Sequence, residues 1–229
     1  MFTPQIIFND ENLIVFNKPS GLLSIRDNKH PNEKTAIDFA CEYLRVKNVY
    51  PVHRIDKDTS GVLIIAKTPY AQKKMSDIIY KRQIKKIYLA LVTGKVKRDG
   101  EINLPVLRTM SGKVKIDNKG KSAFTIYRVK KIYKKYTLLQ VEPKTGRTHQ
   151  IRVHLAGIGH PLAYDRVYGS RKPLVIEKDG KEILRTKRLT LHCSEVMFKY
   201  WKTNKLLHLK AEIPKDLEEI LNILEKNGI

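Results

Sequence analysis

A short, continuous apolar run constrains the fold of this 229-residue chain more than any other feature of its sequence. The run, residues 61–66 (GVLIIA), has the length of a β-strand and carries no polar residue on either alternating face. Such a strand is typical of the interior of a sheet that is covered on both sides. It is far shorter than the roughly 20 apolar residues that a membrane-spanning helix needs. The run therefore predicts a central, buried strand in a globular protein that does not enter a membrane.

The remaining segments predict more strands than helices. We expect a hairpin from 6–8 and 13–16, further strands at 87–92, 123–129, 137–141, 189–191, 196–198 and 206–209, and helices at 35–44, after Pro69, at 148–156 and after Pro214. The polar stretch 165–188 has little periodicity, and we expect a long surface connection there. Because strands and helices do not alternate as βαβ units, we predict the α+β class. The expected architecture is a single domain, 1–229, on a large, mainly antiparallel mixed sheet flanked by helices.

Positive charge is concentrated in the middle of the chain. The net charge is +22, and residues 51–135 hold 22 basic and six acidic side chains, whereas residues 1–50 hold six of each. A basic segment on an otherwise balanced chain is typical of a protein that binds a polyanion. Lysine-rich proteomes also enrich lysine, so the charge favours a nucleic-acid partner without establishing one. The densest basic runs, which suit phosphate binding, are Lys81-Arg82, Lys85-Lys86, Lys130-Lys131 and Lys134-Lys135.

The two cysteines, Cys41 and Cys193, belong to no CxxC pair, so the sequence predicts neither a disulfide framework nor a cysteine zinc site. The first residues show no basic segment followed by an apolar one, as a secretory signal would. We therefore expect a soluble, cytoplasmic protein without a metal.

Two polar segments are candidates for chemistry. The first, residues 53–61 (HRIDKDTSG), precedes the buried strand and is either a turn or a site. A kinase catalytic loop is excluded, because no Asn follows its Asp at the required spacing. The second, residues 144–155, carries Arg147, His149 and Arg152 at the start of a helix. It lacks the P-loop pattern, and its two histidines are five residues apart, so they do not share a helix face as zinc ligands. A capped helix with a solvated basic face is the alternative.

Taken together, these segments resemble the RluA-like family of RNA pseudouridine synthases. Residues 53–68 are similar to the family signature HRLDxxTSGLLLxAK. Residues 146–169 are similar to GRTHQIRVHLxxxGHPLxxDxxYG. Three shorter blocks also match in family order: NKPSG at 17–21, KIYLALVTG at 86–94 and RLTLH at 188–192. Five blocks in order are far more specific than any one alone.

The resemblance implies an enzyme that breaks the N1–C1′ bond of uridine, turns the uracil and joins C5 to C1′, without cofactor or metal. By this resemblance Asp56 is the catalytic nucleophile, a role that an ionised carboxylate suits because it can trap a cationic sugar centre. Arg152 is implied to pair with Asp56, Tyr88 to pack against the target base, and Arg54 to help fill the place that the base leaves. The site of covalent attack, C1′ of the sugar or C6 of the base, and a glycal route stay open.

The implied partner is structured RNA, either ribosomal (23S rRNA), transfer RNA or both. Only about 16 residues precede NKPSG, so we expect no N-terminal S4 RNA-binding domain, and we expect a monomer. Two other functions remain as alternatives. One is a non-catalytic RNA-binding or ribosome-assembly protein on the same fold, which would not need Asp56, Tyr88 and Arg152 together. The other is a uridine-directed glycosidase, which would need a general acid that the motifs lack.

Overall fold

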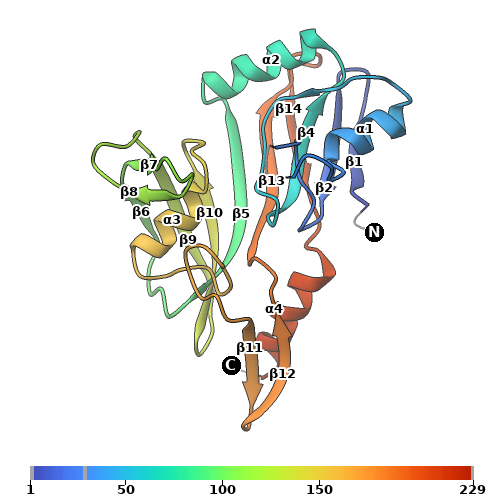
Figure 1. Cartoon of the computed structure of the whole chain (residues 1–229). Helices are drawn as coiled ribbons and strands as arrows, with labels where there is room; N and C mark the ends of the chain where they lie inside the picture. Colours follow the sequence, from blue (N-terminus) through green and yellow to red (C-terminus); the bar gives the residue numbers. More distant parts are fainter. Residues whose placement is uncertain (1–2, 28–29, 228–229) are drawn as a thin grey trace. The chain divides into compact units, whose positions relative to one another are not determined.

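The computed structural model describes residues 3–27 and 30–227, which divide into two compact units. Of the described residues, the first unit comprises 3–27, 30–86 and 192–213. The second unit comprises 87–191 and 214–227. Figure 1 labels their elements. Two strands run from one unit into the other, because β5 (Ile84–Thr93) begins in the first unit and β13 (Leu191–Lys199) begins at the last residue of a second-unit segment.

In the first unit, the strands form a mixed sheet around β4 (Ser60–Ala66), whose seven residues are all buried. This confirms the central strand that the apolar run predicted. Strands β1 and β2 form the expected antiparallel hairpin, β2 pairs antiparallel with β4, and β13 pairs parallel with β4. The other first-unit strands are antiparallel partners of these, and the bounds are β1 (Gln5–Asn9), β2 (Leu13–Lys18), β3 (Tyr50–Pro51) and β14 (Leu206–Lys210).

Two helices of the first unit begin where the sequence predicted. Helix α1 (Ala36–Leu44) starts at Thr35, whose side chain forms a capping box with Asp38. Helix α2 (Pro69–Tyr80) starts at Thr68 and has Pro69 in its first turn, where the missing N–H of proline costs no hydrogen bond. Helix α1 buries Ala36 and Ala40 against a core that includes Ile14, Leu63 and Ile55.

In the second unit, four antiparallel strands follow the order β5-β10-β9-β6. Helix α3 (Gln150–Gly157) lies beside β9 and β10 (Figure 1), and helix α4 (Lys215–Asn227) buries Leu217, Ile220 and Leu224. The remaining bounds are β6 (Gly100–Asn103), β7 (Val106–Arg108), β8 (Val114–Ile116), β9 (Phe124–Ile132) and β10 (Tyr136–Pro143). The predicted α+β class and its mainly antiparallel, mixed pairing are confirmed, whereas a single catalytic domain stays a prediction.

The expectation for residues 165–188 was wrong, because this stretch contains a second hairpin, β11 (Leu174–Lys178) and β12 (Lys181–Thr186). The two strands are joined by Asp179 and Gly180, both with positive φ (51° and 74°). This is the turn chemistry that closes two-residue hairpins, and Asp-Gly is its strongest sequence signal. The polar composition of the flanking strands concealed that signal.

Candidate active site

Asp56 lies in the loop between β3 and β4, and it is partly buried. The preceding residue, Ile55, is buried in the core of the first unit, with 6% of its surface exposed. The Asp56 carbonyl accepts a hydrogen bond from the Thr59 amide at 3.1 Å, which forms a tight turn before β4. The carboxyl-bearing residue is therefore placed between a core anchor and the start of a buried strand.

The N-terminal segment 18–24 holds the backbone of this loop. Lys18 is fully buried, and its ammonium donates to the carbonyls of Pro19, Leu22 and Lys57 at 2.7–2.9 Å. The other donors of the segment reach the carbonyls on both sides of Asp56, and they are Ser20 Oγ to Asp58 (2.6 Å), the Gly21 amide to Lys57 (2.9 Å) and Ser24 Oγ to Ile55 (2.8 Å). A buried ammonium needs such acceptors, because an unpaired buried charge is costly. The NKPSG block therefore fixes the main chain that carries Asp56.

His53 ties the same loop to β4. Its Nε2 accepts the Ile64 amide at 3.0 Å. Burial first, and the neighbouring charge of Lys86 second, hold the pKa of the His53 imidazole well below its usual value. His53 is therefore a neutral acceptor at pH 7, and its place in the HRID motif has a structural reason.

The start of β4 is joined to β13 at very close range. Ser60 Oγ and His192 Nδ1 lie 2.8 Å apart, both side chains are fully buried, and His192 Nε2 lies 3.2 Å from the carbonyl of Ala211. Gly61 has a φ of +114°, and a Cβ there would lie 2.1 Å from the Cys193 carbonyl oxygen. Only glycine allows this approach. Ser60 and Gly61 of the first motif and His192 of the RLTLH motif therefore meet in one contact between β4 and β13, which we call the joint.

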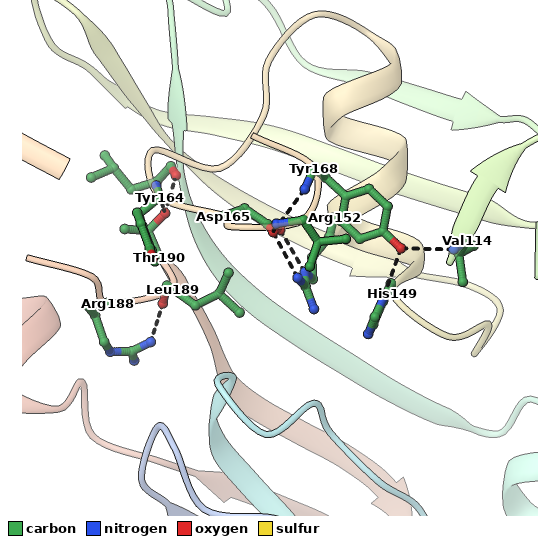
Figure 2. A network of polar contacts seen from close by, with 11 residues as sticks. Val114, His149, Arg152, Tyr164, Asp165, Tyr168, Arg188, Leu189 and Thr190 are labelled. Atoms are coloured by element: carbon green, nitrogen blue, oxygen red, sulfur yellow. Dashed lines mark hydrogen bonds and ion pairs between the residues drawn. The ribbon is translucent and has the colours of Figure 1, made fainter. Parts of the chain in front are cut away.

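In the second unit, Arg152 forms a buried, bidentate ion pair with Asp165 (Figure 2). Arg152 Nε lies 2.7 Å from one carboxylate oxygen and Nη2 lies 2.8 Å from the other, and the side chains are 7% and 0% exposed. The same carboxylate accepts the amides of Val167 and Tyr168 at 2.8 and 3.1 Å. Burial alone would raise the pKa of Asp165, but these hydrogen bonds and the charge of Arg152 outweigh it and hold the pKa below its usual value. Arg152 is thus fixed in one orientation.

A second contact set surrounds this pair. The Arg152 guanidinium lies 5.2 Å from the centre of the Tyr168 ring, which is within cation–π range. The Tyr168 hydroxyl lies 2.8 Å from His149 Nδ1 and accepts the Val114 amide at 3.3 Å (Figure 2). Tyr168 therefore links the helix that carries Arg152 to the β7–β8 hairpin.

The four residues singled out in the sequence are divided between the units. Asp56 and the exposed Arg54 belong to the first unit, and Tyr88 and Arg152 belong to the second. Tyr88 is 8% exposed and lies on β5, opposite Val141 of β10. The pairing of Asp56 with Arg152 stays a prediction. Sequence reasoning assigned no role to Asp165, Tyr168 or Lys18, although all three stand inside the matched blocks.

Within residues 3–27 and 30–227, no three His, Cys, Asp or Glu side chains gather as metal ligands would. None of the helices in the described part of the chain is long and apolar enough to cross a membrane. Chemistry without metal or cofactor stays a prediction from the resemblance.

Comparison with known proteins settles the family. The model of the RNA pseudouridylate synthase family matches residues 12–157, which include the Asp56 loop, Tyr88 and Arg152. The chain belongs to this family. Ribosomal large subunit pseudouridine synthase D of Haemophilus influenzae is 36% identical over 96% of the chain and 71% of its own length. The Nitrosomonas europaea protein of the same name is 36% identical over 96% of the chain and 65% of its own length.

These relatives confirm the RluA-like resemblance and the enzyme class, an RNA pseudouridine synthase. Among solved structures, human RNA pseudouridylate synthase domain containing 4 aligns with a TM-score of 0.76 and 23% identity over 96% of this chain and 92% of that one. This likeness confirms the fold. The chain spans 65 to 71% of the length of the two curated relatives.

Proposed function

We propose that this RNA pseudouridine synthase isomerises uridine in large-subunit ribosomal RNA and that Asp56 is its catalytic nucleophile. The target rests on one observation, the 36% identity to synthases named for the large ribosomal subunit over nearly the whole chain. A cytoplasmic, monomeric enzyme is part of the same proposal.

The reaction needs no net transfer of electrons or groups. The N1–C1′ bond breaks, the uracil turns, a C5–C1′ bond forms, C5 loses its proton and N1 gains one. An ionised carboxylate can serve this sequence by trapping the electron-poor C1′ of the sugar or by adding to C6 of the base. The backbone contacts of segment 18–24 support Asp56 in this role, because a nucleophile must be held close to its productive position.

We extend the proposal to Tyr88, Arg152 and Arg54. Tyr88 would pack against the turned uracil, and Arg54, which is exposed, would occupy the place that the base leaves in the RNA. Arg152, which the family resemblance pairs with Asp56, would fix the rotamer of that carboxylate.

The test maps pseudouridine in the RNA of a strain that lacks the protein. Total rRNA and tRNA are treated with a pseudouridine-selective carbodiimide and analysed by primer extension. We expect the loss of one or a few stops in large-subunit rRNA, restored by the wild-type protein and not by Asp56→Asn. Asp58→Asn is the matched control, because it removes an exposed carboxylate two residues away and should restore the stops.

Binding separates the nucleophile from an RNA-contact role. Purified Asp56→Asn should bind the mapped RNA nearly as tightly as the wild type while forming no pseudouridine. An active Asp56→Asn protein would refute the nucleophile. An unchanged map of large-subunit rRNA would refute the target, and stops lost only in tRNA would move the target there.

A further inference from the structure

The end of the β9–β10 hairpin is the densest basic segment of the second unit. Residues 130–135 (KKIYKK), which we call the lysine tip, include the last three residues of β9 and precede β10. The Tyr133 amide donates to the Tyr136 carbonyl at 2.8 Å, which closes the turn. The four lysines of the tip are exposed, whereas Tyr133 is 8% exposed. The turn therefore presents four cations on an anchored backbone.

A second basic segment is bound directly to the tip. The Gly94 amide donates to the Lys135 carbonyl at 2.8 Å, and Thr137 Oγ1 donates to the Gly94 carbonyl at 2.8 Å while accepting the Val96 amide at 3.0 Å. These bonds hold residues 95–98, which add three exposed basic side chains: Lys95, Lys97 and Arg98. Seven basic residues thus gather on two segments that are far apart in sequence.

Two carboxylates lie beside these cations. Glu225 of α4 pairs with Lys131, and Asp99 accepts the Val129 amide at 2.8 Å. Two negative charges against seven positive ones leave most of the positive charge of these segments uncompensated. Lys95, Lys131 and Lys134 line an open hollow of about 450 Å³, together with Ile132, Tyr133, Leu224 and Glu225. A hollow lined by both cations and apolar groups suits a phosphate chain with an unstacked base.

The strand register gives the distance between this surface and Tyr88. Tyr88 lies opposite Val141, and Thr93 lies opposite Tyr136, the first residue after the lysine tip. Five residues of extended strand therefore separate Tyr88 from the basic surface, which is roughly 17 Å at about 3.4 Å per residue. An RNA in contact with both must extend well beyond the target nucleotide.

We propose that the lysine tip and residues 95–98 form a docking surface for the phosphate backbone of the substrate RNA, away from the uridine that reacts. Charge complementarity supports an RNA occupant, and the proposal rests on the proposed function only in taking the substrate to be RNA. The surface would determine how tightly a structured RNA is held and would leave the chemical step unchanged. It therefore acts on the Michaelis constant and not on kcat.

The test is a double variant, Lys95→Gln/Lys134→Gln. The matched control is Lys178→Gln/Lys181→Gln, which removes two exposed lysines at the end of the β11–β12 hairpin in the same unit. Binding of a labelled rRNA stem-loop is measured by fluorescence anisotropy over a range of KCl concentrations, and pseudouridine formation is measured at saturating RNA. We expect the tip variant to bind roughly 5- to 30-fold more weakly at low salt, and its log–log salt slope to fall by about 1.4–1.8, since each lost phosphate contact removes about 0.7–0.9.

RNA length supplies a second arm. A fragment that extends less than roughly 17 Å from the target uridine cannot reach the tip, so wild type and tip variant should bind it equally. Binding of the long RNA that is unchanged in the tip variant, or weakened equally in the control, would overturn the proposal. So would a loss that persists with the short fragment. If instead the wild type forms no pseudouridine in any RNA, the proposed function fails while the binding comparison still decides the docking surface.

Discussion

The second unit contains two ion pairs of opposite character. Arg152 and Asp165 are 7% and 0% exposed and meet in two parallel hydrogen bonds, whereas Lys131 and Glu225 are 47% and 52% exposed and meet through one pair of atoms. Breaking a buried pair leaves an uncompensated charge in the interior, but water solvates the partner left by a broken surface pair. The difference indicates that the first pair sets geometry, while the second adjusts the charge that an approaching polyanion meets.

The largest expected effect comes from Asp165→Ala. The Arg152 charge would lose its partner, and the amides of Val167 and Tyr168 would lose their acceptor. We expect a loss of about 3–5 kcal/mol in the free energy of unfolding, measured by urea denaturation. Glu182→Ala is the control, because it breaks an exposed pair with Arg185 and should leave the unfolding curve close to that of the wild type. Equal losses in the two variants would contradict the comparison.

A smaller effect on the free energy of unfolding is expected for Arg152→Lys, which keeps the positive charge but removes the two-pronged guanidinium donor. Lysine offers a single ammonium and cannot donate two parallel bonds to one carboxylate. We expect destabilisation of about 1.5–3 kcal/mol, the range of one hydrogen bond to a charged group. Arg185→Lys is the exposed counterpart, and its unfolding curve should match that of the wild type.

Acid should weaken the buried pair in a defined pH window. The pKa of Asp165 is lowered in the folded protein, so the stabilisation is complete above the unfolded carboxyl value of about 3.9 and is lost as the pH falls through the folded value. The difference in unfolding free energy between wild type and Asp165→Asn should be constant from about pH 7 to 5 and should shrink below about pH 4. A difference that already declines near neutrality would show that another group carries the effect.

The smallest effect is expected for Glu225→Gln. The exposed pair with Lys131 should contribute almost nothing to stability, and still less at high salt, because water and ions solvate both charges. The same change removes a negative charge beside the lysine tip, so affinity for the stem-loop RNA should rise about twofold while the unfolding curve stays in place. Weaker binding would mean that Glu225 contacts RNA by accepting hydrogen bonds.

Sequence patterns predicted most elements, because burial periodicity and capping are local. The strand around Val62, the helix capped by Thr35 and the helix opened by Pro69 illustrate this. The Asp179-Gly180 hairpin was missed, since its strands are polar and their pairing is not visible from composition.

The supporting contacts of the site were also missed. Their partners are distant in sequence, as for Lys18 with Lys57 and for Ser60 with His192. The motif resemblance identified Asp56 and Arg152 as candidates, but no pattern gives a distance between side chains. The role of Asp165 in orienting Arg152 therefore needed the fold.

The joint between Ser60 and His192 spans 132 positions of the chain and has consequences for biosynthesis. Its parallel strand pair closes only after β13 has been made, and by then the intervening second-unit segment has left the ribosome. Long-range closure of this kind carries a high entropic cost and slows folding. The β1–β2–β4 strands of a nascent chain thus wait with one edge of the most apolar strand incompletely paired. Until residue 192 is available, Ser60 and Gly61 at the start of β4 lack their parallel partners His192 and Cys193.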